Sequence, residues 1–221
     1  MTLNYTKKAC SITDNIFRQI VSGLRKDSFE TEKDIDRFIR AKIKENKCKL
    51  AFSPIVSMGK NASEIHHKPN DTKLSKGFLM MDFGAKYKGI CSDCTRTVYL
   101  GKPDNKERKL YRLVKEAQEL CVELSFDGMS LNDIDAIARD GLVPYRKMFV
   151  HSLGHGVGKR IHQAPSLGPN KKGVLKIGQV ITIEPGIYFK NRSGIRIEDT
   201  LVVGKNKGKR LTKTSKELII I

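Results

Sequence analysis

The sequence contains no tryptophan, few aromatic residues and no long hydrophobic run. Aromatic side chains make up 7% of its 221 residues. Proteins that bind single-stranded nucleic acid stack bases on such side chains, and this composition offers no platform of that kind. No apolar stretch approaches the roughly 20 residues that cross a bilayer, and no segment has the pattern of a secretory signal. We therefore expect neither a membrane partner nor a nucleic-acid partner.

Cysteine is scarce, and its number is odd. Five cysteines without a secretory signal predict a reducing, cytoplasmic compartment. Cys91 and Cys94 have CxxC spacing, but no second pair completes a zinc site. Residues three apart on a strand point to opposite faces, so this pair predicts neither zinc binding nor redox chemistry. We expect Cys91 to share a strand face with Asp93.

Acidic residues are outnumbered by basic ones. The chain has 42 Lys and Arg against 24 Asp and Glu, which gives a formal net charge of +18. Such an excess attracts nucleic acid or acidic peptides. The basic residues are scattered, except for a denser cluster at 205–210 that continues to Lys213 and Lys216. Charge runs are usually solvated, so we interpret this cluster as an exposed turn.

Hydrophobic periodicity predicts four helices whose apolar stripes face a core. Thr31 and Asp34 have the spacing of a capping box at the start of the second helix. Two hairpins between the helices would complete an α+β layout. The predicted helices span 10–25, 31–46, 110–124 and 130–138.

Five residues of metal-binding type lie inside apolar or glycine-rich segments. Burying an isolated carboxylate costs several kcal/mol, so four such acids need compensation by cations. Two divalent metal ions would supply it. The five residues are Asp82, Asp93, His155, Glu184 and Glu198.

The first two acids lie on one predicted hairpin. Asp82 ends an apolar, strand-like run, and Asp93 lies in the next one. Gly84 and Gly89 between them permit a turn.

The last two acids follow the same plan. Glu184 ends a strand-like run, Glu198 lies in the next, and Gly186 and Gly194 flank the turn. Two halves built alike predict an internal pseudo-twofold axis, with the metals between the halves.

The fifth residue, His155, lies in the glycine-rich run 151–158. Glycines allow close backbone approach there. One imidazole among carboxylates suits first-row transition metals better than calcium or magnesium. We expect Mn²⁺ or Co²⁺, with Fe²⁺ or Zn²⁺ as alternatives.

Five sequence blocks resemble, in order, those of the pita-bread metallopeptidase family, which includes methionine aminopeptidase and the Xaa-Pro dipeptidases and aminopeptidases. The resemblance runs from about Ser11 to Leu218. It implies an α+β pita-bread fold, a curved antiparallel sheet with a pseudo-twofold and helices on its outer face. We expect a single catalytic domain over 1–221, without a separate N-terminal domain, and a possible homodimer. The blocks are 65–69, 81–85, 92–97, 151–158, and 182–188 with 195–199.

The resemblance also assigns roles to individual residues. The family's five metal ligands fall on the five residues already singled out. Its additional histidines, which contact the substrate or the reacting centre, fall on His66, His151 and His162, and its substrate-binding arginine falls on Arg196. We expect Glu184 to relay a proton as well as to bind metal.

Two of the blocks, 92–97 and 184–188, are similar to the proline-specific branch of the family. Members of that branch generally carry an extra N-terminal domain, and Gln163 stands where an acid is common. The sequence thus predicts an exopeptidase that hydrolyses the N-terminal Xaa-Pro bond of a peptide with a hydroxide held by two metals. The alternatives are a methionine aminopeptidase, or a non-catalytic member that binds protein or nucleic acid.

Overall fold

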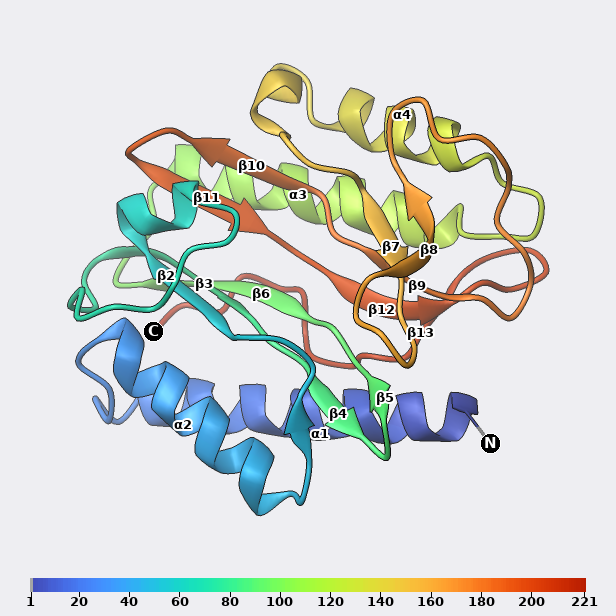
Figure 1. The fold of residues 1–221 in the computed structure, drawn as a ribbon. Helices are drawn as coiled ribbons and strands as arrows, with labels where there is room; N and C mark the ends of the chain where they lie inside the picture. Colours follow the sequence, from blue (N-terminus) through green and yellow to red (C-terminus); the bar gives the residue numbers. More distant parts are fainter. Residues whose placement is uncertain (1) are drawn as a thin grey trace.

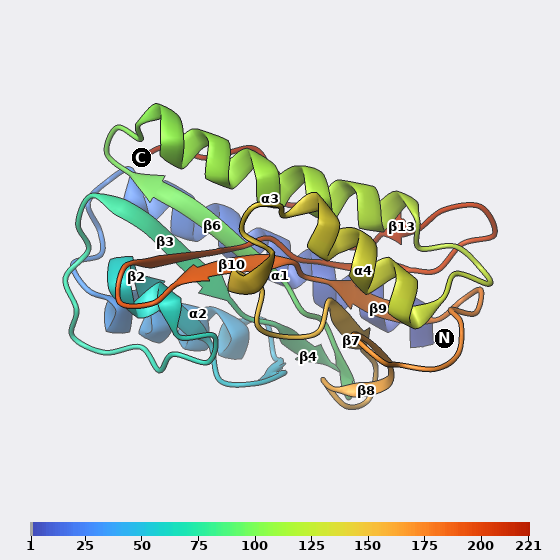
Figure 2. The ribbon, with the colours of Figure 1, turned by 90° about the horizontal axis from the view of Figure 1, so that it is seen from above.

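Four helices form two layers, one on each side of the strands, in a computed structural model that describes residues 2–221 (Figure 1). The blue pair α1 and α2 covers the strands of the first half, and the green-yellow pair α3 and α4 covers those of the second (Figure 2). None of these helices is both long and apolar enough to cross a bilayer. The helices are α1 (Thr2–Leu24), α2 (Glu32–Glu45), α3 (Asn105–Glu123) and α4 (Leu131–Gly141).

The helix starts follow local capping chemistry. At α2, Thr31 Oγ1 accepts from Asp34 N at 3.3 Å, and Thr31 N donates to the Asp34 carboxylate at 2.8 Å, so the predicted capping box is confirmed. A second box, Asp104 with Glu107, starts α3 five residues before the predicted boundary. Helix α1 starts eight residues before its predicted boundary. Its first turns bury Thr6 and Ala9, which give no hydrophobic signal.

The first half of the sheet is a long hairpin with a break in each arm. Strand β3 pairs with β2 and with β6, where Asp82 lies opposite Thr95. Beyond the breaks, β4 pairs with β5 around Lys88 and Gly89, whose φ angles of 46° and 81° suit a two-residue hairpin turn. The strands are β1 (Lys49–Leu50), β2 (Ile55–Met58), β3 (Gly77–Asp82), β4 (Ala85–Tyr87), β5 (Ile90–Cys91) and β6 (Thr95–Leu100).

The second half repeats this plan. Strand β9 pairs with β12, and beyond the breaks β10 pairs with β11. Strand β7 lies between β8 and β9, and β13 pairs with the far edge of β12. A Cβ on Gly154 would collide with the carbonyl of Thr182, so this close approach requires glycine. The strands are β7 (Gly154–Gly156), β8 (Gln163–Leu167), β9 (Val180–Ile183), β10 (Gly186–Phe189), β11 (Ser193–Arg196), β12 (Asp199–Val202) and β13 (Lys209–Arg210).

The breaks carry the acids. Asp82 ends β3, whereas Asp93, Glu184 and Glu198 lie between strands rather than within them, which corrects the expectation for Asp93 and Glu198. In a strand, successive side chains point to opposite faces of the sheet, whereas a side chain in a break need not follow this alternation. The backbone stays paired across the two halves, since Glu198 N donates to Thr95 O at 3.1 Å. The acids of both halves therefore meet where the hairpins cross.

Two large hydrophobic cores hold this arrangement, one beneath each helix layer. Ile16 and Ile39 are fully buried in the first, and Val114 and Ile134 in the second. Short 3₁₀ turns, η1 (Gly59–Ser63) and η2 (Arg146–Met148), flank the strands. The acid-bearing breaks lie between the two cores, so each half positions its own acids.

Candidate metal centre

One cavity of about 890 Å³ collects the predicted site residues. Its wall includes all five proposed metal ligands together with His66, His151, His162 and Arg196. The structure thus brings together residues that are up to 132 positions apart, from His66 to Glu198.

His155 turns one ring nitrogen toward the acids. Its Nδ1 lies 3.2 Å from Gly156 O and donates to that carbonyl, which leaves Nε2 facing the carboxylates. Nε2 is 3.2 Å from Glu184 Oε1 and 3.6 Å from Asp93 Oδ2. Burial lowers the pKa of His155, but the bond to Glu184 outweighs it and the pKa is raised. A hydrogen bond from the other ring nitrogen to a main-chain carbonyl is a common way to orient a metal-binding imidazole.

Three carboxylates carry buried oxygens without a partner among residues 2–221. These are Oδ1 of Asp82, Oδ1 of Asp93 and Oε1 of Glu198. Burial, and then repulsion from neighbouring carboxylates, raises the pKa of Asp93 and Glu198 well above their usual values. One donor atom each of Asp93, His155 and Glu198 lies within 4.8 Å of the others. Unpartnered buried acceptors are rare in proteins, and this set fits a divalent cation in charge, chemistry and spacing.

Two threonines orient the second pair of acids. Thr95 Oγ1 donates to Glu198 Oε2 at 2.7 Å, and Thr182 Oγ1 donates to Glu184 Oε1 at 3.1 Å. Burial raises the pKa of Glu184, but the hydrogen bond from His155 and nearby positive charge prevail and lower it to about 2. Glu184 is therefore ionised at neutral pH.

Arg196 is buried beneath the acids. Its Nη2 donates to Asp82 Oδ2 at 2.7 Å, its Nη1 to Tyr188 OH at 2.9 Å and its Nε to Thr95 Oγ1 at 3.1 Å. These contacts fix Asp82 and hold a positive charge next to it. Its assignment to substrate binding stays a prediction, since the guanidinium is mainly committed to protein groups.

Tyr188 extends this chain of contacts to His151. The His151 Nδ1 donates to Ser152 O at 2.8 Å, and its Nε2 accepts from Tyr188 OH at 2.7 Å. Burial lowers the pKa of His151, which keeps its Nε2 available as an acceptor. Sequence reasoning gave Tyr188 no role, although it lies in a block that carried the family resemblance.

We expect Tyr188→Phe to lower the free energy of unfolding by about 1–3 kcal/mol, because the change leaves buried groups on Arg196 and His151 unpaired. Urea unfolding followed by circular dichroism measures this. Tyr145→Phe is the matched control, since the Tyr145 ring packs on Phe189 and its hydroxyl has no partner among residues 2–221. Equal stability of the two variants would contradict this account.

Two other predicted histidines are exposed parts of the cavity wall. His66 and His162 are both exposed and line the wall, and the His162 ring lies 4.4 Å from that of His155. Burial and the neighbouring His155 lower the pKa of His162. Of the histidines at motif positions, these two are the most accessible to a ligand.

His67, which no prediction used, anchors the loop that carries His66. It is buried, and its Nε2 lies 2.8 Å from Glu32 Oε2 in the first turn of α2. The same carboxylate group accepts from Met58 N at 2.7 Å and from Asn70 N at 3.1 Å. No sequence pattern links a helix start to a loop 35 residues away.

The cysteines take no part in the centre. Cys91 Sγ lies 3.9 Å from Lys159 O, and Cys94 Sγ lies 3.7 Å from Glu198 O, so the pair faces different segments. Cys91 is not part of the cavity wall. All five cysteines are free.

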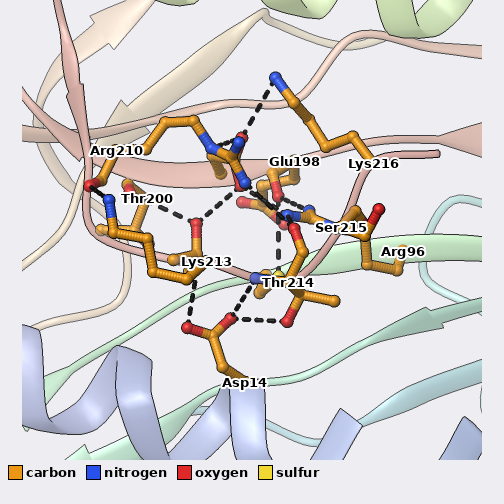
Figure 3. Close-up of polar contacts among 12 residues, drawn as sticks. Asp14, Arg96, Glu198, Thr200, Arg210, Lys213, Thr214, Ser215 and Lys216 are labelled. Carbon is orange, nitrogen blue, oxygen red and sulfur yellow. Dashed lines mark hydrogen bonds and ion pairs between the residues drawn. The ribbon is translucent and has the colours of Figure 1, made fainter. Parts of the chain in front are cut away.

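A buried ionic network supports the centre from behind (Figure 3). Asp199, fully buried, lies 2.6 Å from Arg96 Nη2, 2.7 Å from Arg210 Nε and 3.6 Å from Lys216 Nζ. Burial raises the pKa of Asp199, but these cations prevail and lower it. The expectation that the basic cluster is only a solvated turn is wrong for Arg210 and Lys216, because a buried acid on β12 attracts them inward.

Arg96 uses all five of its N–H donors in this network (Figure 3). One donor meets Asp199, and the other four meet main-chain carbonyls on both sides of the guanidinium. On the side of the centre these carbonyls belong to Thr95 and Glu198, and on the other side to Thr214 and Ser215. Arg96 thus fastens two acid-bearing breaks to the segment 210–216.

Fold and site together define a class: an α+β metalloprotein with a carboxylate-rich centre between two similar halves. The chain belongs to metallopeptidase family M24, whose pattern matches residues 4–205. The family resemblance and the predicted pita-bread fold are thereby confirmed, and the family identifies divalent metal as the cofactor.

Several proteins similar to this chain are named as proline-specific peptidases. The chain is 39% identical to the Xaa-Pro dipeptidase of Pyrococcus furiosus over 217 residues. This aligned region covers 96% of this chain and 62% of that protein. The dipeptidase structure from Pyrococcus horikoshii superposes with a TM-score of 0.92 at 38% identity, over 100% of this chain and 62% of that one. The X-Pro aminopeptidase structure from Thermotoga maritima superposes with a TM-score of 0.94 at 30% identity, over 100% of this chain and 63% of that one. The chain thus spans under two thirds of the length of these relatives.

Proposed function

We propose that this protein is a metal-dependent exopeptidase that hydrolyses the N-terminal Xaa-Pro bond of peptides. The observation that carries the proposal is a cavity in which donor atoms of Asp93, His155 and Glu198 converge. In the same cavity Asp82, Asp93 and Glu198 each have a buried oxygen without a hydrogen-bond partner among residues 2–221. The proline preference rests on the relatives that are named Xaa-Pro dipeptidase or X-Pro aminopeptidase.

Two divalent ions, Mn²⁺ or Co²⁺ with Fe²⁺ or Zn²⁺ as alternatives, would be held by the five proposed ligands. When bound, such a pair supplies an activated water and polarises the scissile carbonyl. The ligands are Asp82, Asp93, His155, Glu184 and Glu198.

The protein groups around the ligands would handle protons and orientation. Glu184, oriented by Thr182, is the proposed proton acceptor. His162, exposed beside His155, would donate to the developing oxyanion. His66 would contact the residue after the scissile bond. His151, with both ring nitrogens engaged, would hold Tyr188 and Arg196 behind the site.

The test is release of the first amino acid from Ala-Pro, Ala-Pro-Ala and Met-Ala-Ser by protein stripped of metal and then given Mn²⁺ or Co²⁺. We expect turnover of the two proline peptides that depends on added metal. Turnover of Met-Ala-Ser alone would establish the methionine aminopeptidase alternative. If stoichiometric metal binding is accompanied by no hydrolysis of any peptide, the protein is a binding member of the family.

A further inference from the structure

The cavity extends well beyond the proposed ligands, toward helix α2. On this side its wall is formed by Asp36 and Arg40 of α2, by the segment 52–54 before β2, and by Lys68. A volume of about 890 Å³ lies near the upper end of the range for small-molecule sites, about 300–1,000 Å³. There is room for a ligand that reaches from the acids to α2.

Arg40 is oriented but not fully used. Its Nε lies 3.0 and 2.9 Å from the two carboxylate oxygens of Asp36, one helical turn earlier. Both terminal amino groups, Nη1 and Nη2, have no hydrogen-bond partner among residues 2–221. Asp36 thus fixes the guanidinium on one edge, while the other edge retains the paired donors that recognise a carboxylate.

Lys68 adds a second cation to the same wall. It is exposed, and its ammonium has no ion-pair partner in the described part of the chain. The third cation of the wall, Arg196, is committed to Asp82 and Tyr188. Nearby Lys33, outside the wall, is paired with Asp71 at 2.6 Å. Available positive charge in the cavity is therefore concentrated near α2.

The cavity wall combines acidic, basic and apolar side chains. The four carboxylates of the proposed ligands belong to it, and so do Lys68 and the Asp36–Arg40 pair of α2. Side chains such as Phe52, Ile65 and Ile161 also belong to the wall. A short peptide with free termini has matching groups, since its ammonium group suits the acids and its carboxylate suits Arg40 and Lys68.

We propose that Arg40, assisted by Lys68, binds the C-terminal carboxylate of a substrate of three to five residues. This inference rests on the proposed function. It makes the preferred substrate a short oligopeptide with a free C-terminus rather than a dipeptide, whose carboxylate would remain close to the metal ligands.

The experiment compares Ala-Pro-Ala, Ala-Pro-Ala-Ala and Ala-Pro-Ala-Ala-Ala with their C-terminal amides, using metal-loaded protein. Amidation of the best-fitting peptide removes one charge-assisted bond, so we expect kcat/KM to fall at least about tenfold. We expect the loss mainly in KM. Arg40→Gln should lower kcat/KM for the free acid by a similar factor and remove the preference over the amide. Arg40→Lys should retain part of it.

Arg37→Gln is the matched control, because Arg37 lies on the same helix, pairs with Asp34 and is not part of the cavity wall. It should leave the acid-to-amide ratio unchanged. Equal hydrolysis of acids and amides by the wild type, or an equal loss on both in Arg40→Gln, would overturn the inference. If no peptide is hydrolysed, the proposed function fails separately. The affinities of the same acids and amides for the same variants, measured by calorimetry, then decide whether Arg40 binds the C-terminal carboxylate.

Discussion

Asp93→Asn is expected to weaken metal binding by more than about 100-fold and to remove peptide turnover. Substituting a residue that only supports a metal ligand weakens metal binding by up to about 100-fold, and a ligand should matter more. The physical reason is that Asp93 brings an unpartnered oxygen and a negative charge to the point where His155 and Glu198 converge. Asparagine keeps the shape but removes the charge. Equilibrium dialysis with Mn²⁺, followed by metal analysis, measures the affinity without relying on activity.

The same substitution should not destabilise the metal-free protein and is expected to stabilise it. Repulsion and burial raise the pKa of Asp93, so its ionised form disfavours folding at neutral pH, and a neutral side chain relieves this cost. The melting temperature of metal-free Asp93→Asn should equal or exceed that of the wild type, whereas added Mn²⁺ should raise it only in the wild type. Asp140→Asn, an exposed acid paired with Arg146, is the control. Mn²⁺ stabilising Asp93→Asn as strongly as the wild type would rule out this ligand role.

Arg96→Met should lower the free energy of unfolding by about 3–5 kcal/mol, since it removes the cation that is paired most closely with the buried Asp199 and leaves only Arg210 and Lys216 near that charge. Arg96 is 1% exposed, and its loss removes one donor from Asp199 and one from each of four main-chain carbonyls. Because one of these carbonyls belongs to Glu198, metal affinity should fall as well. Urea unfolding followed by circular dichroism suits a chain that lacks tryptophan.

Two comparisons separate the specific role of Arg96 from a general loss of charge. Arg112→Met removes an exposed arginine paired with Glu116 on α3, and it should change stability by no more than about 0.5 kcal/mol. Arg96→Lys keeps the charge but has three donors in place of five, and it should fall between the wild type and Arg96→Met. A loss in Arg96→Met as small as that in Arg112→Met would refute the proposed support.

Local signals in the sequence were sufficient for the helices and for the repeated hairpins. Thr31 and Asp34 marked the start of α2, and Gly89 marked the turn of the first hairpin. The acids stood out because charge inside apolar runs is costly unless it is paired. Their convergence into one cavity followed from the matching plans of the two halves.

What the sequence did not reveal depends on contacts between distant segments. Arg210 and Lys216 had the composition of a solvated turn, and only the buried Asp199 on β12 explains their inward position. His67 and Glu32 carried no local pattern that would pair them. The early start of α1 was missed for another reason, since its buried face there is formed by small and polar residues.

The order of these segments along the chain bears on how the protein matures. Residues 210–216 leave the ribosome after all five proposed ligands, yet Thr214 and Ser215 provide carbonyls that hold Arg96, and Asp14 of α1 accepts from Lys213 N and Thr214 N at 2.8 and 2.9 Å. A nascent chain that already displays every ligand therefore still lacks the support behind Glu198. We therefore expect tight metal capture to be completed only after this segment has docked against α1 and β12.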